Sequence, residues 1–125
     1  MPDKLAFLIW AATPDQPALC VTPLIHALAA RALDAEVELH FAGPAVRLLV
    51  AGVADELYAT PAREKSIGDF LHQVAAEDVR LLACSMASAA WIADGETLIP
   101  QCAGAAGATA FVARSLDPAW RTLVF

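Results

Sequence analysis

Basic residues are few in this sequence, and they are scattered. The chain has 125 residues, of which eight are Lys or Arg and fourteen are Asp or Glu, which gives a net charge of −6. Phosphate backbones are bound by clustered Lys and Arg side chains, and this sequence contains no such cluster. We therefore expect no nucleic acid among its partners.

Cysteine is also scarce. Cys20, Cys84 and Cys102 form no CxxC pair, and no combination of cysteine and histidine has the spacing of metal ligands. An odd number of cysteines in a chain of this length argues against a framework of disulfides. We expect three free thiols in a reducing cytoplasm, and neither a metal nor a cofactor.

No uncharged stretch is long enough to cross a membrane. The longest, residues 97–113, falls short of a span and contains Pro100 and Gly104. Lys4 and the apolar run that follows it have some features of a signal peptide, but Asp3 and the shortness of the run argue against one. We expect neither a membrane-spanning segment nor a signal peptide. The signature motifs of serine hydrolases, zinc proteases and P-loop enzymes are absent as well.

Apolar residues dominate the composition. They make up 58% of the chain, and charged residues only 18%. Such a chain either buries strands on both faces of a sheet or hides apolar surface in an oligomer, and we expect both. At this length the chain should form one domain over residues 1–125.

The apolar pattern alternates between strands and helices along the whole chain. Continuous or alternating apolar runs predict strands, and apolar residues spaced by three and four predict helices. The expected strands cover residues 5–10, 36–42, 79–83 and 121–125, with a short one at 98–99, and the expected helices cover residues 22–33, 45–50, 66–76, 85–93 and 102–115. This alternation predicts an α/β fold with a flavodoxin-like, doubly wound sheet of four or five mostly parallel strands and helices on both faces.

Polar residues refine two of these assignments. Glu38 and His40 alternate with apolar residues, so we expect their strand to lie near an edge of the sheet and His40 to be partly exposed. Thr22 followed by Pro23 has the pattern of an N-cap and a first helical residue, which predicts where the first helix begins.

Cys84 is the best candidate for chemistry. It closes an apolar strand and opens the small-residue stretch SMASAA at residues 85–90. In a doubly wound sheet, ligands and reactive groups lie at the carboxyl ends of the strands, and the N–H groups of a helix start favour a thiolate. The alternative is that Cys84 is a small buried side chain, which is also typical of free cysteine.

Two further residues are secondary candidates. Cys102 lies near the start of the expected helix at 102–115, so it could be a second relay or redox thiol. His40 lies close to the carboxyl end of its strand and could reach the same edge of the sheet. We expect Cys20 to serve packing only.

Five stretches, in this order, resemble the DsrE/DsrF-like family. They are LAFLIW at 5–10, VTPLI at 21–25, EVELHF at 36–41, VRLLACSMA at 79–87 and AFVAR at 110–114. The resemblance covers nearly the whole chain. It implies a flavodoxin-like subunit that assembles into a homotrimer or homohexamer. In sulfur-relay members it also implies a persulfide on a cysteine that follows a central strand, which is the position of Cys84.

Three functions follow as hypotheses. The resemblance implies a cysteine-based sulfur carrier or sulfurtransferase subunit that passes sulfane sulfur between donor and acceptor proteins. The high apolar content and the small-residue segment favour, as an alternative, a non-catalytic oligomeric protein that binds a small ligand or serves assembly. A thiol redox protein is the third, and it requires the Cα atoms of Cys84 and Cys102 to lie within about 7 Å of each other.

Overall fold

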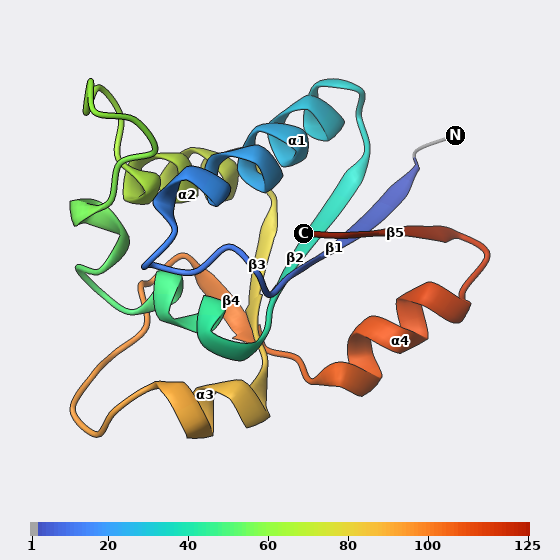
Figure 1. Ribbon diagram of the computed structural model, residues 1–125. Helices are drawn as coiled ribbons and strands as arrows, with labels where there is room; N and C mark the ends of the chain where they lie inside the picture. The colour runs from blue at the N-terminus through green and yellow to red at the C-terminus, as the bar shows by residue number, and fades with distance from the viewer. Residues whose placement is uncertain (1–2) are drawn as a thin grey trace.

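A five-stranded parallel sheet forms the centre of the computed structural model, which describes residues 3–125 (Figure 1). The strands are β1 (Lys4–Ile9), β2 (Glu36–Phe41), β3 (Arg80–Ala83), β4 (Cys102–Ala105) and β5 (Trp120–Val124). Their order across the sheet is β4-β3-β2-β1-β5, and every neighbouring pair is parallel. The α/β class with a parallel sheet, predicted from the sequence, is confirmed.

The central strand β2 is buried on both faces, since Leu39 on one face and Glu38 on the other are at most 1% exposed. Phe7 in β1 and Leu39 in β2 are paired in register and are at most 1% exposed. They belong to a core that also includes Phe41 and Leu81. Burial in this core explains the large apolar side chains that both strands carry on this face.

Two helices, α1 (Val21–Ala32) and α2 (Ile67–Ala76), lie side by side on one face of the sheet (Figure 1). The chain steps in one direction from β1 to β2 to β3, and right-handed crossovers then place both helices on the same side. The predicted start of the first helix was wrong, because the N-cap is Cys20 and Thr22 lies within the first turn. A short 3-10 helix, η1 (Pro17–Leu19), leads directly into this cap.

The start of α2 is fixed by a capping box. The hydroxyl of Ser66 accepts a hydrogen bond from the backbone N–H of Asp69, and the Asp69 carboxylate accepts one from the Ser66 N–H. Because Ser66 is buried, we expect Ser66→Ala to lower the free energy of unfolding by about 1 kcal/mol in urea denaturation. As a control, Ser85→Ala at an exposed helical position should change it by less than about 0.5 kcal/mol, and equal losses would contradict the capping role.

The opposite face of the sheet carries α4 (Ala108–Leu116), while α3 (Ser85–Trp91) lies beyond the carboxyl end of β3 (Figure 1). The chain crosses from β4 at one edge to β5 at the other, against the earlier direction, so α4 falls on the other side. None of the residues of α4 is fully buried. This face is therefore covered only in part.

The predicted helix at residues 102–115 was wrong in its first part. Residues 102–105 form the edge strand β4, and the helix begins only at Ala108. The sequence CAGA lacks the β-branched and aromatic side chains typical of strands, so pairing with β3 decides its conformation. The short strand expected at 98–99 is only an isolated bridge between Leu98 and Val50.

Two short 3-10 helices lie in the middle of the chain. The short helix expected at 45–50 is the 3-10 helix η2 (Gly43–Leu49), and the stretch 51–65, expected to be irregular, contains η3 (Ala54–Glu56). Arg47 in η2 forms two hydrogen bonds with the carboxylate of Glu96, at 2.9 and 3.0 Å. This ion pair holds the segment after α3 against η2.

Candidate functional site

Cys84 lies at the turn from β3 into α3, where the sequence predicted it. Its backbone is extended, and it is the N-cap of α3. Its N–H donates to the carbonyl of Phe41 at 2.9 Å, and its carbonyl accepts from the N–H of Ser88 at 2.8 Å. The thiol itself makes no capping hydrogen bond, and Cys84 is half-buried. Two backbone hydrogen bonds therefore fix the position of Cys84, while its sulfur forms no hydrogen bond with the first turn of α3.

An apolar cavity of about 210 Å³ opens beside this thiol, and we call it the thiol cavity. Its walls come from the carboxyl ends of β1, β2 and β3, from the segment after β4 and from α4. The lining residues are Leu8, His40, Phe41, Ala42, Cys84, Ala106, Gly107, Ala108, Phe111 and Val112. Only His40 among them carries a nitrogen or oxygen in its side chain. The cavity is therefore suited to an apolar group next to the sulfur.

His40 is buried, and its predicted partial exposure was wrong. It is 3% exposed and lies on β2, the central strand of the sheet, whereas an edge position was expected. It is in register with Leu82, so alternation along β3 puts Cys84 on the same face of the sheet. The imidazole packs edge-on against Phe111 of α4, with ring centroids 5.3 Å apart. The structure thus brings His40 and Cys84 into the walls of one cavity.

A buried ion cluster stands behind His40. Glu38 is 1% exposed, and its carboxylate accepts hydrogen bonds from His40 Nε2 at 3.0 Å, Arg80 Nη1 at 3.2 Å and both Arg114 Nε and Nη2, at 3.1 and 2.9 Å. Arg114 also stacks over the Trp120 ring at 4.0 Å. These partners replace the water that a buried carboxylate loses, which is why a central strand can hold Glu38.

The sequence reasoning missed three members of this cluster, namely Glu38, Arg80 and Arg114. The only signal was the strand EVELHF itself, in which two titratable residues interrupt an apolar run. Alternation of this kind by itself predicts a strand with one exposed polar face. A buried carboxylate needs cationic partners, and those partners lie 42 and 76 residues further along the chain.

The ion cluster and its burial change the pKa of both Glu38 and His40. Burial would raise the pKa of Glu38, but the hydrogen bonds from Arg114 and His40 together with their charges outweigh it, so the pKa is lowered. Burial lowers the pKa of His40, and the charges of Arg114 and Arg80 act in the same direction, against the hydrogen bond to Glu38. At neutral pH, Glu38 is therefore ionised and His40 is uncharged.

Acid should weaken the fold through Glu38. Its pKa in the folded state lies below the ordinary 4.5, so the stability it contributes is fully present above about pH 4.5 and is lost as the pH falls through the folded value. We expect the free energy of unfolding, measured in urea between about pH 6 and pH 3, to fall less steeply with acid in Glu38→Gln than in the wild type. Parallel curves for the two proteins would contradict this role.

The other two cysteines lie away from the cavity. Cys20 is buried, its thiol donates to the carbonyls of Thr13 and Gln16, and burial together with Asp15 raises its pKa to about 11. Its expected packing role agrees with this environment. Cys102 opens the edge strand β4 and is paired with Leu81, so its expected place at a helix start was wrong.

Cys84 and Cys102 are not placed to form a disulfide. Cys84 lies three residues beyond Leu81, the partner of Cys102, and three residues of strand span about 10 Å. That separation exceeds the reach of a disulfide, about 7 Å between Cα atoms. All three cysteines are free thiols in the part of the chain that the structure describes. The geometry thus argues against the redox-pair hypothesis.

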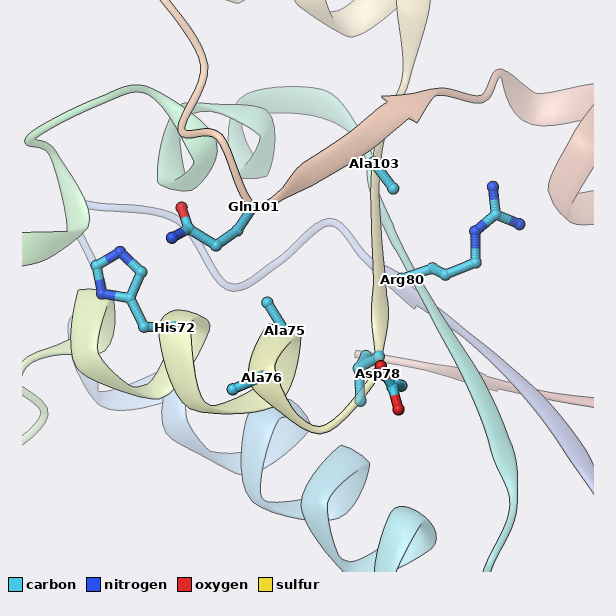
Figure 2. A pocket seen from close by; sticks show the side chains of 8 residues that line it. His72, Ala75, Ala76, Asp78, Arg80, Gln101 and Ala103 are labelled. Carbon is cyan, nitrogen blue, oxygen red and sulfur yellow. The ribbon is translucent and has the colours of Figure 1, made fainter.

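A larger groove lies at the opposite end of β3. It has a volume of about 510 Å³ and is lined by α2, the start of β3 and the edge strand β4. Figure 2 shows His72 and Gln101 on one side of it and Arg80 on the other. No cysteine lines this groove, so it is separate from the thiol cavity.

Two further features of residues 3–125 bear on function. No group of three or more His, Cys, Asp or Glu side chains among them could hold a metal ion. Within the same residues, no helix combines the length and the apolar character needed to cross a membrane.

Comparisons with known proteins give a family and a fold. The family model for the DsrE/DsrF-like family matches residues 4–125. The crystal structure of the ychN protein from E. coli is similar with a TM-score of 0.76 and 18% identity, over 98% of this chain and 99% of that one. A protein of unknown function, MTH1491 from Methanobacterium thermoautotrophicum, is similar with a TM-score of 0.68 and 16% identity, over 98% and 99% of the two chains. No curated protein matches the chain.

Proposed function

Because this chain belongs to the DsrE/DsrF-like family, as its sequence predicted, we propose that it is a cysteine-based sulfur carrier with Cys84 as the carrier thiol. Family membership points to a role related to sulfur relay. The observation that carries the finer proposal is a free, half-buried thiol held at the carboxyl edge of the sheet and open to an apolar cavity. Parallel α/β sheets place their reactive groups at this edge.

Sulfur transfer at Cys84 is a thiol exchange without net oxidation. The Cys84 thiolate attacks the outer sulfur of a donor persulfide, R–S–SH, a new S–S bond forms at Sγ, and the donor's S–S bond breaks. The donor leaves as a thiolate and takes up the proton that Cys84 gave up, so the products are Cys84–S–SH and R–SH. An acceptor thiolate then repeats the attack on the outer sulfur of Cys84.

The environment of Cys84 suits a sulfane sulfur bound to its thiol. A terminal sulfur on Cys84 would have the thiol cavity beside it, whose walls are apolar apart from His40. Apolar walls keep out water and charged molecules, and exclusion of water limits side reactions of a reactive intermediate. Cys20 is unsuited to the role, because its buried thiol has its pKa raised to about 11.

Intact-mass measurement tests the proposal directly. The wild-type protein is incubated with a low-molecular-weight persulfide under anaerobic conditions and then digested for peptide mapping. We expect one added sulfur atom, located on the peptide that contains Cys84. An unmodified protein, or sulfur found only on Cys20 or Cys102, would overturn it.

We also propose that the chain forms a homotrimer or homohexamer in the cytoplasm and exchanges sulfur with donor and acceptor proteins. Apolar side chains on α4 and β5 support the assembly, since Val112, Leu116 and Val124 are 50%, 80% and 61% exposed. No residue of α4 is fully buried in the single chain. Large exposed apolar side chains on two adjoining elements, as on α4 and β5, favour association.

A charge on this surface should dissociate the oligomer. We expect Leu116→Glu to shift the protein to a smaller species in native mass spectrometry, because an ionised carboxylate in an apolar interface is costly. Leu33→Glu is the matched control, since Leu33 at the end of α1 is 83% exposed, on the other face of the sheet. An unchanged mass for Leu116→Glu, or dissociation only by Leu33→Glu, would show that α4 is outside the interface.

The thiol cavity also favours a second candidate function, a non-catalytic subunit that binds a small ligand. Its apolar lining would hold such a ligand whether or not Cys84 carries sulfur. Under this alternative, Cys84→Ser would leave both ligand binding and assembly unchanged. A ligand that copurifies with the Cys84→Ser protein in native mass spectrometry, together with no sulfur loading of the wild type, would favour it.

A further inference from the structure

A groove of about 300 Å³ lies on the face of the sheet that α4 covers only in part, and we call it the arginine groove. Its walls come from β2, β3, the end of β4 and α4. Three charged side chains line it, namely Glu38, Arg80 and Arg114. Sulfur transfer at Cys84, as proposed above, uses none of these charges. Their arrangement decides which ligand the groove can bind.

Both arginines reach the surface around a buried carboxylate. Arg80 Nη1 and Arg114 Nη2 donate to the same oxygen of Glu38, Oε2, at 3.2 and 2.9 Å, so the two guanidinium groups lie next to each other. The Arg80 and Arg114 side chains are 53% and 34% exposed, whereas Glu38 is buried. Figure 2 shows the Arg80 side chain extending from β3 away from His72 and Gln101 of the larger groove. A ligand from solvent can therefore reach both arginine side chains, while the Glu38 carboxylate is shielded from it.

Most hydrogen-bond donors of the two arginines are unused. A guanidinium group has five N–H donors in a planar fork that matches a carboxylate. Arg114 gives two of them to Glu38, through Nε and Nη2, and Arg80 gives one, through Nη1. In the part of the chain that the structure describes, neither arginine donates to any other group. Both side chains can therefore bind a second acceptor without releasing Glu38.

The charges that line the arginine groove do not cancel. At neutral pH Glu38 is ionised and His40 is uncharged, so the two arginines leave one positive charge in excess. The charges of Glu36 and Asp117 also act on Arg114, but neither residue lines the groove. In a chain whose net charge is −6, a groove with an excess positive charge points to an anion as its ligand.

The remaining lining favours a ligand with an apolar body. It consists mainly of side chains without nitrogen or oxygen, contributed by Leu82, Ala105, Ala106, Ala110 and Ala113. A volume of about 300 Å³ corresponds to roughly ten waters at about 30 Å³ each, enough for a small organic acid. Apolar walls with a few placed polar groups are typical of small-molecule sites, in which the polar groups orient the ligand.

We propose that the arginine groove binds a small monocarboxylate with an apolar body. The carboxylate accepts hydrogen bonds from Arg80 and Arg114, and the apolar body lies against Leu82 and the alanines of α4. Binding of this ligand is a second function, and it does not depend on sulfur transfer. The groove adjoins the thiol cavity, because His40 and Ala106 line both, but Cys84 does not line the groove.

The proposed assembly leaves this groove open. Ala110, Ala113 and Arg114 are spaced by three and four residues, so they share one face of α4. Val112 and Leu116, the exposed apolar residues of α4 that support assembly, lie on the opposite face of the helix, at 100° per residue. A neighbouring subunit on that face would not occupy the groove.

Calorimetry with three matched probes tests the proposal on the wild-type protein at neutral pH. Benzoate has both the charge and the apolar ring, benzamide has the ring without the charge, and acetate has the charge without the ring. We expect benzoate to bind about tenfold more tightly than either, because charged acceptors form the stronger hydrogen bonds and the ring buries apolar surface. No binding of benzoate, or benzamide or acetate binding as tightly as benzoate, would overturn the proposal.

Two variants with matched controls assign binding to the groove. Arg80→Gln should weaken benzoate about tenfold and leave benzamide unchanged, whereas Arg121→Gln on β5 should change neither. Ala110→Leu fills the groove without altering its charges and should abolish benzoate binding, whereas Thr109→Leu, at an exposed position of α4 outside the lining, should not. Melting temperatures near that of the wild type would show that the variants fold. Benzoate binding unchanged in Ala110→Leu, or weakened equally by Arg80→Gln and Arg121→Gln, would contradict the assignment.

The result is distinguishable from that of the sulfur-carrier proposal. Cys84→Ser should bind benzoate with the affinity of the wild type, because Cys84 does not line the arginine groove. A protein that binds benzoate but takes up no sulfur would overturn the carrier proposal alone. A protein that loads sulfur at Cys84 but binds no benzoate would overturn the groove assignment alone.

Discussion

Cys84→Ser should abolish sulfur loading from a persulfide donor, the largest effect we expect of any single substitution. A serine hydroxyl preserves the size of the side chain and cannot hold a sulfane sulfur. The backbone bonds of residue 84 to Phe41 and Ser88 do not involve the side chain, so the turn should be unaffected. Intact-mass measurement after incubation with donor should find the wild-type protein loaded and the variant unmodified.

Cys102→Ser and Cys20→Ser are the matched controls. Cys102 lies on β4 toward the amino end of β3, and Cys20 is buried with its pKa raised to about 11, so neither substitution should reduce loading at Cys84. Near-identical melting temperatures for the Cys84→Ser and wild-type proteins would show that a loss of loading is chemical. Loading that persists in Cys84→Ser and disappears in Cys102→Ser would move the carrier role to the edge strand.

Arg114→Ala should be the most destabilising substitution of an exposed or half-exposed side chain. Arg114 supplies two of the hydrogen bonds that hold the buried Glu38 carboxylate, at 3.1 and 2.9 Å. The substitution removes two of the four hydrogen bonds to a buried carboxylate and leaves Arg80 as its one cationic partner, so we expect a loss of about 2 to 3 kcal/mol. Urea denaturation at neutral pH measures it.

Arg121→Ala is the control for loss of a surface arginine. Arg121 is exposed on β5, so its replacement should change the free energy of unfolding by less than about 0.5 kcal/mol. Adding Glu38→Leu to Arg114→Ala should recover much of the loss, because the buried carboxylate that lacks two of its hydrogen bonds is then gone. Equal effects of the two arginine variants, or a double variant less stable than Arg114→Ala, would show that burial of Glu38 does not depend on this pair.

The sequence was sufficient to predict the features that depend on residues close together in the chain. Alternation of apolar runs and helical spacing identified four of the five strands and the helices α1, α2 and α3. The same pattern put Cys84 at the end of a strand and the start of a helix, where it lies in the structure. The position of this thiol required no long-range information, because strand, turn and helix are adjacent in the chain.

Only the tertiary structure decided the remainder. The small-residue segment at 102–105 is a strand because β3 offers it a hydrogen-bonding edge, which local propensity could not indicate. Glu38 and His40 are buried on the central strand because Arg80 and Arg114, distant in sequence, neutralise the carboxylate. An alternating polar pattern is the same in the sequence whether its polar face meets water or an ion cluster. The sequence thus determined which thiol lies at the carboxyl edge of the sheet, and the packing of distant charges against β2 determined which titratable side chain lines the same cavity.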